Sequence, residues 1–106
     1  MSFLYATRLE EIAEGRMAGV NILGHELVLV REGGTVHALD GWCPHRNGPL
    51  AQGNYCGGHL ICPWHGWEFR VIDGALDFNP AVALRKYPVE VRGGEVWVEI
   101  PDAGTA

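Results

Sequence analysis

The chain has 106 residues, of which 47% are hydrophobic and 20% are charged, so it is long enough for one domain and too short for two. Its formal net charge of −5 disfavours nucleic acid and anionic membranes as partners. No apolar run approaches the roughly 20 residues of a membrane span, and charged side chains interrupt residues 1–16, so no signal-peptide core is expected. We therefore expect a single cytoplasmic domain over residues 1–106, monomeric, with no membrane or nucleic-acid partner.

Short strands joined by tight turns are predicted, since the chain contains 15 glycines and 6 prolines. Strands are predicted at residues 3–7, 17–23, 26–31, 35–39, 89–92 and 95–100. Two hairpins are expected, with their turns at residues 24–25 and 93–94. In the last strand apolar and polar residues alternate, so Val96 and Val98 share the face expected to be buried. The pattern indicates an all-β fold of small antiparallel sheets in a sandwich or partly open barrel.

Residues 41–67 interrupt this pattern. The segment holds all three cysteines and three of the five histidines, and Arg46 is its only charged residue. Backbone rich in proline and glycine is expected to be irregular here and to need something other than sheet pairing to hold it. A bound metal centre would serve.

Two short motifs in this segment each pair one cysteine with one histidine. One residue separates Cys43 from His45 and two separate Cys62 from His65, with sixteen residues between the motifs. Two thiolates and two imidazoles at such spacing can form a tetrahedral metal site, for which structural zinc is one candidate. Zinc motifs usually pair like ligands, however. A cysteine and a histidine in each loop better suit a two-iron cluster with both thiolates on one iron and both imidazoles on the other.

The two motifs and their surroundings resemble the Rieske family over most of the chain. The supporting residues are Gly48-Pro49-Leu50, Gly53, Trp64 to Phe69, Asp73-Gly74, Pro80 and Tyr87-Pro88-Val89. The resemblance implies a Rieske fold, in which a cluster-binding subdomain of about residues 41–70 sits on a base of antiparallel sheets. It also implies one [2Fe–2S] cluster, with Cys43 and Cys62 on the inner iron and His45 and His65 on the outer iron.

The resemblance further indicates a subclass. High-potential relatives carry two extra cysteines joined in a disulfide, and Gly48 and Trp64 stand at those positions here. Trp67 and Phe69 replace a serine and a tyrosine whose hydroxyls bond near the cluster, and loss of such bonds lowers a cluster's potential. The chain is thus similar to the low-potential ferredoxins of bacterial ring-hydroxylating dioxygenases.

The implied function is one-electron transfer from a flavin-dependent reductase to a terminal oxygenase. No residues remain for the mononuclear iron domain of an oxygenase, so the chain is not expected to be an enzyme by itself. The alternative is a small Rieske subunit of a larger reductase, such as assimilatory nitrite reductase.

Several other residues are weighed as structural. Cys56 lies outside both motifs and is expected to be a passive thiol. His25, His37 and His59 have no cysteine at motif spacing and are expected to be hairpin or strand residues. Residues 76–81 resemble the family's proline loop that covers the cluster.

Overall fold

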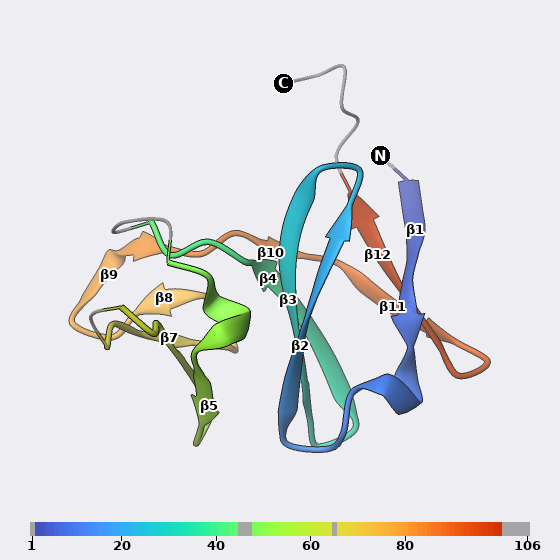
Figure 1. Cartoon of the computed structure of the whole chain (residues 1–106), viewed down its shortest axis with the longest axis horizontal. Helices are drawn as coiled ribbons and strands as arrows, with labels where there is room; N and C mark the ends of the chain where they lie inside the picture. The colour runs from blue at the N-terminus through green and yellow to red at the C-terminus, as the bar shows by residue number, and fades with distance from the viewer. Residues whose placement is uncertain (1, 45–47, 65, 101–106) are drawn as a thin grey trace.

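The computed structural model describes residues 2–44, 48–64 and 66–100, and these form short antiparallel strands with two single-turn 3-10 helices. The molecule measures 36 × 34 × 20 Å and has two lobes, a larger base and a small lobe beside it (Figure 1). The predicted all-β antiparallel fold is confirmed. No helix in the described part of the chain is long and apolar enough to cross a membrane.

The base contains a three-stranded sheet in the order β1-β12-β11 and a four-stranded sheet in the order β10-β4-β3-β2. Its strands are β1 (Ser2–Arg8), β2 (Arg16–Ile22), β3 (His25–Glu32), β4 (Thr35–Asp40), β10 (Lys86–Tyr87), β11 (Val89–Arg92) and β12 (Glu95–Ile100). The helix η1 (Leu9–Glu11) follows β1. All six strands predicted from the sequence are therefore present, with ends that agree to within one residue.

Strand β3 lies between two hydrophobic cores. Leu27 and Leu29 pack with β12 in the core of the base, whereas Val28 and Val30 face the other way. That second core also contains Cys43 and residues of the small lobe. Because side chains alternate along a strand, covering both faces buries all four apolar positions in the middle of β3. The four-stranded sheet is thus the wall on which the small lobe rests.

The first hairpin turns one residue earlier than predicted. His25 pairs with Ile22 inside the sheet, so the turn consists of Leu23 and Gly24 instead of Gly24 and His25. Both turn residues have positive φ, 52° for Leu23 and 84° for Gly24, as a two-residue turn between right-twisted strands requires. A leucine seldom adopts this conformation, so residue type gives no signal for a turn at this position.

The small lobe is a five-stranded sheet whose strands follow one another in chain order. They are β5 (Asn54–Cys56), β6 (His59–Ile61), β7 (Glu68–Arg70), β8 (Ala75–Leu76) and β9 (Asn79–Ala83), preceded by the helix η2 (Leu50–Gln52). The expectation of irregular backbone throughout residues 41–67 was therefore wrong for β5 and β6. Leu60 on β6 is buried in the core, and β6 pairs in regular antiparallel register with β5 and β7. Residues 76–81 are likewise part of the β8–β9 hairpin, with Pro80 exposed on β9.

Candidate metal centre

Cys43 begins a six-residue loop that leaves the four-stranded sheet just after β4. Its amide donates to the carbonyl of Gly48, with an N···O distance of 2.8 Å, and this bond closes the loop. Leu50 then donates to Gly41 at 2.9 Å, while Trp42 and Pro49 form an isolated bridge. The stem of the loop is therefore a small ladder, and Cys43 at its base is completely buried.

Cys62 begins a second loop of the same construction after β6. Its amide donates to the carbonyl of Trp67 at 2.8 Å, again five residues further on. Gly66 donates back to the carbonyl of Cys62 at 3.1 Å. Cys62 is 3% exposed and belongs to the same hydrophobic core as Cys43. Two matching loops thus each present one buried thiol from a hydrogen-bonded stem.

The two loops touch at Gly48. A Cβ atom added to this glycine would lie 2.7 Å from Sγ of Cys62 and 3.4 Å from Cδ2 of Trp64, so the first loop passes directly over the thiol of the second. Only a residue without a side chain fits this contact unchanged. Two buried thiols in adjacent loops are soft donors of the kind that iron–sulfur clusters take, so the described donors fit such a group.

The structure places only part of the predicted ligand set. His45 and His65, like Arg46, lie outside the described residues. Cys56 is exposed on β5, away from the shared core. Trp64 is also exposed, at 53%, on the second loop.

Trp67 lies at the end of the second loop and packs against the hydrophobic core that contains Cys43 and Cys62. Its ring lies 6.4 Å from the ring of Phe69 and meets the ring of Phe78 edge to face at 5.3 Å, between centroids. Phe69 is completely buried, whereas Phe78 is 68% exposed. The three rings connect the core beneath Cys62 with the β8–β9 turn. Apolar packing thus supports the end of this loop.

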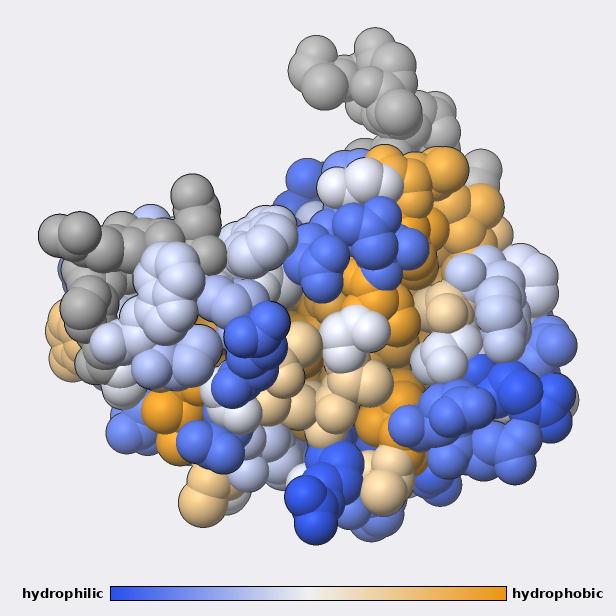
Figure 2. Space-filling view, in the orientation of Figure 1, coloured by the Kyte–Doolittle hydropathy of each residue, from blue (hydrophilic) through white to orange (hydrophobic). Residues whose placement is uncertain are grey.

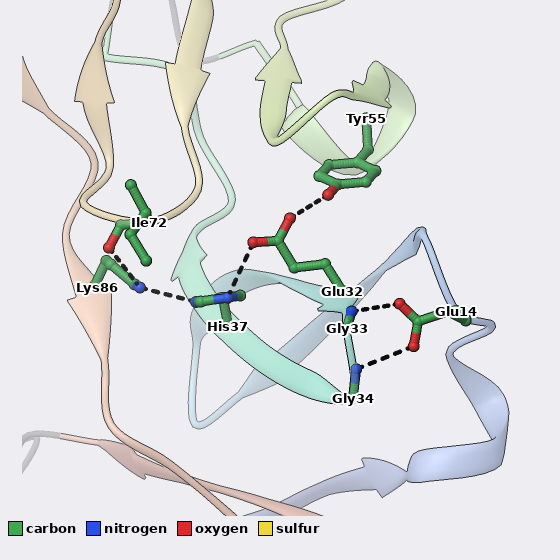
Figure 3. A network of polar contacts seen from close by, with 8 residues as sticks. All are labelled: Glu14, Glu32, Gly33, Gly34, His37, Tyr55, Ile72 and Lys86. Atoms are coloured by element: carbon green, nitrogen blue, oxygen red, sulfur yellow. Dashed lines mark hydrogen bonds and ion pairs between the residues drawn. The ribbon is translucent and has the colours of Figure 1, made fainter.

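A polar network at the edge of the second core ties the small lobe to the base (Figure 3). Glu32 at the end of β3 accepts a hydrogen bond from the hydroxyl of Tyr55 on β5. Nε2 of His37 lies 3.3 Å from the same carboxylate. On the other side, Nζ of Lys86 lies 3.0 Å from Nδ1 of His37 and donates to the carbonyl of Ile72 at 3.1 Å. The bond from Tyr55 to Glu32 at one end and the bond from Lys86 to Ile72 at the other therefore join the two lobes.

The charges in this network determine its protonation. An ammonium group can only donate, so Lys86 requires an unprotonated Nδ1 on His37, and Nε2–H then donates to Glu32. Burial, assisted by the positive charge of Lys86, lowers the pKa of His37. Burial also lowers the pKa of Lys86. The hydrogen bond to Glu32 raises the pKa of Tyr55 to about 12. A neutral His37 is thus the form that this arrangement holds.

Sequence reasoning missed this network and the contact at Gly48. His37 was correctly expected on a strand, but Tyr55 is 23 residues from Glu32, and Lys86 is 49 from His37. No local spacing signals such pairs. The alternation of β3 did offer one indication, since Glu32 lies on the same face as Val28 and Val30, which the small lobe covers.

The fold and the site together define a class of protein, an all-β domain in which two matched loops each carry a buried cysteine. The model of the Rieske [2Fe-2S] domain matches residues 2–88, so the chain belongs to the Rieske family, and its cofactor is one Rieske-type [2Fe–2S] cluster. The ferredoxin component of the alkene monooxygenase system of Xanthobacter autotrophicus is 37% identical over 103 residues. This alignment spans 92% of the chain and 84% of that protein.

Solved structures agree with this assignment. The ferredoxin of carbazole 1,9a-dioxygenase from Nocardioides aromaticivorans IC177 superposes with a TM-score of 0.84 at 27% identity, covering 92% of this chain and 97% of that one. A chain from the complex of reduced oxygenase and oxidized ferredoxin in carbazole 1,9a-dioxygenase gives a TM-score of 0.82 at 32% identity. It covers 91% of both chains.

Proposed function

We propose that this chain is a ferredoxin that carries one electron at a time from a flavin-dependent reductase to a terminal oxygenase. The observation that carries the proposal is the pair of matched loops with buried Cys43 and Cys62, found in a chain that aligns with ferredoxin components over most of their length. When bound, a Rieske cluster accepts and releases a single electron, and its histidine ligands raise its potential. The chain itself is an electron-transfer component and not an enzyme.

We further propose Cys43, His45, Cys62 and His65 as the four ligands. The shared core and the contact at Gly48 support the two cysteines, and the histidines are proposed from their motif positions in the same loops. Serine in place of Cys43 or Cys62 is expected to remove the iron and sulfide and the Rieske electron paramagnetic resonance signal. Cys56→Ser is the matched control and should retain both. Equal losses in all three variants would refute the ligand set.

The proposed docking surface is apolar. Pro44, Pro63 and Trp64 are exposed beside the two cysteines, in a segment with one charged residue. The strongest hydrophilic colour in Figure 2 lies over the base, on the side of η1 and the β11–β12 turn. A partner that meets the loops would therefore avoid burying charge.

Electron delivery tests the function and the surface together. With a reductase and an oxygenase of a ring-hydroxylating system, stopped-flow rates of oxidation of the reduced protein should fall little between low and moderate salt, because screening acts on charge pairs. Trp64→Ala should slow delivery, whereas Leu23→Ala, an exposed apolar residue of the base, should not. A steep loss of rate with salt would point to docking through the acidic base. We propose cytoplasmic and monomeric operation as well, and light scattering during size exclusion checks the latter.

A further inference from the structure

Three potential metal ligands meet on the outer face of the small lobe. They are His59 on β6, Glu68 on β7 and Asp77 in the turn between β8 and β9, and one ligand atom from each lies within 4.8 Å of the others. The amide of Asp77 donates to the carbonyl of Glu68 at 2.9 Å, which holds the turn against β7. Leu60 and Phe69, on the same two strands, are completely buried, so the three polar side chains lie on the face opposite the core that contains the cysteines.

The contacts of His59 leave a place for a cation between its ring and Asp77. Nδ1 lies 3.2 Å from the carbonyl oxygen of Gly57, which can only accept, so this contact is a hydrogen bond when Nδ1 carries the proton. Nε2 lies 3.3 Å from Oδ1 of Asp77. In a neutral imidazole this nitrogen would present its lone pair to a carboxylate oxygen, and two acceptors would repel each other. When Nδ1 donates to Gly57, a second proton or a metal ion between Nε2 and Oδ1 removes this repulsion.

The spacing favours a metal ion. A charge-assisted hydrogen bond between imidazolium and carboxylate has an N···O distance of about 2.7–2.9 Å. Two ligand atoms that are each about 2.05 Å from a tetrahedral zinc ion lie about 3.3 Å apart. The separation of 3.3 Å between Nε2 and Oδ1 thus matches the edge of a zinc tetrahedron. A ligating histidine also usually donates its other ring N–H to a backbone carbonyl, and Nδ1 of His59 lies at such a distance from Gly57.

The surrounding charges permit a divalent cation to approach. Glu68 and Asp77 bring two negative charges and line a surface hollow of about 240 Å³ together with Gly66 and Phe78. Arg70 lies opposite His59 on β7. Its guanidinium is paired with Asp73, with an Nη2···Oδ2 distance of 2.8 Å, so its charge is largely compensated.

We propose that Nε2 of His59, Oδ1 of Asp77 and a carboxylate oxygen of Glu68 form a binding site for a divalent cation of the zinc class, with water as the fourth ligand. Glu68 is exposed on a three-residue strand, so rotation of its side chain closes the remaining distance. The bound ion would join β6, β7 and the β8–β9 turn. It would thereby stabilise the small lobe from the side opposite the cysteines.

Calorimetric titration of the cluster-loaded full chain, without a histidine tag, with zinc chloride tests the site. One ion per chain should bind, while the visible absorbance of the cluster stays constant and so shows that zinc does not displace iron. His59→Gln, Glu68→Gln and Asp77→Asn keep the side-chain size and should each weaken binding about tenfold or more, since each removes a donor. Glu90→Gln, an exposed carboxylate on β11, should bind as the parent chain does.

One further variant separates this site from thiol binding. Cys56 is the cross-strand partner of His59 on β5, and an exposed thiol can bind zinc by itself. Cys56→Ser should therefore keep the full affinity and the zinc-dependent rise in melting temperature, and Asp77→Asn should lose both. Loss of binding in Cys56→Ser would overturn the donor set. Unchanged affinity in Glu68→Gln and Asp77→Asn, or no binding to the parent chain, would leave only an imidazolium–carboxylate ion pair.

Discussion

The base and the small lobe are both antiparallel β structures, but they are held together in different ways. Strands of the base reach eight residues, and β12 alternates so regularly that Val96, Val98 and Ile100 are all at most 2% exposed. Strands of the small lobe have two to five residues. One cysteine loop precedes this sheet and the other lies between β6 and β7, and Pro44, Pro63 and Trp64 on these loops are exposed. Burial of apolar surface stabilises both lobes, but the core of the small lobe is completed by Val28 and Val30 of the base, so this lobe depends in addition on its contacts with the base and with the cofactor.

Removal of the cluster should increase the difference in stability between the two lobes more than any other change. Without a group that joins the loops of Cys43 and Cys62, the stems lose their shared anchor, because metal binding free energy is also folding free energy. Amide hydrogen exchange should become faster by orders of magnitude in β5 to β9 after iron is chelated, and stay slow in β3 and β12. Equal loss of protection in both lobes would show that they unfold as one unit.

Gly48→Ala attacks the contact between the two loops. The added methyl group would lie 2.7 Å from Sγ of Cys62, so the loop must move. Overpacking of this kind costs about 1–3 kcal/mol, and the iron content should fall together with the stability of the small lobe. Iron analysis and chemical unfolding of the purified variant measure the two effects. Full iron content at unchanged stability would mean that the loops are more loosely packed than the glycine contact indicates.

The free energy of unfolding should depend on pH through His37, which lies in the polar network between the two lobes. Its pKa is lowered in the folded chain by burial and by Lys86. Below the unfolded value of about 6.5 the unfolded chain therefore binds more protons, and the free energy of unfolding falls as pH falls. The slope from this residue is at most about 1.4 kcal/mol per pH unit and vanishes above the unfolded pKa. Denaturant melts from pH 7.5 to 5 should be flatter in His37→Gln and unchanged in slope in His25→Gln.

Tyr55→Phe tests the other contact between the lobes. The variant removes the hydroxyl that donates to Glu32, while the ring keeps its packing. A partly exposed hydrogen bond of this kind contributes about 1 kcal/mol. Tyr5→Phe, on an exposed ring of the base, is the matched control and should have no effect. In a double-mutant cycle, Tyr55→Phe should cost less in the Glu32→Gln background than in the parent chain. Full additivity would contradict a direct interaction.

The smallest expected effect concerns the base alone. Leu23 is 68% exposed and has a φ of 52°, a conformation that brings its Cβ atom close to a backbone carbonyl oxygen and therefore costs free energy. Leu23→Asn should stabilise the base by about 0.5–1 kcal/mol, because asparagine accepts this conformation in two-residue turns. Thermal unfolding measures the gain. Because the turn is far in sequence from both cysteine loops, the properties of the cluster should not change.

The sequence by itself determined the features that depend on near neighbours in the chain. Alternation located the strands of the base, including the buried face of β12, and the spacing of Cys43 and Cys62 to their histidines predicted a mixed-ligand cluster. Such signals are readable because a strand repeats every two residues and a ligand loop is short. The placement of His45 and His65 at the cluster remains a prediction.

Tertiary structure alone decided which distant residues meet. The contact of Gly48 with Cys62, the bond of Tyr55 to Glu32 and the group formed by His59, Glu68 and Asp77 each join different strands or loops. The turn at Leu23 was decided in the same way, since the pairing of all of β2 with β3 outweighs the preference of a single leucine. Contacts between segments that are not neighbours in the chain depend on how whole sheets pack against each other, which the spacing of residues within one segment does not specify.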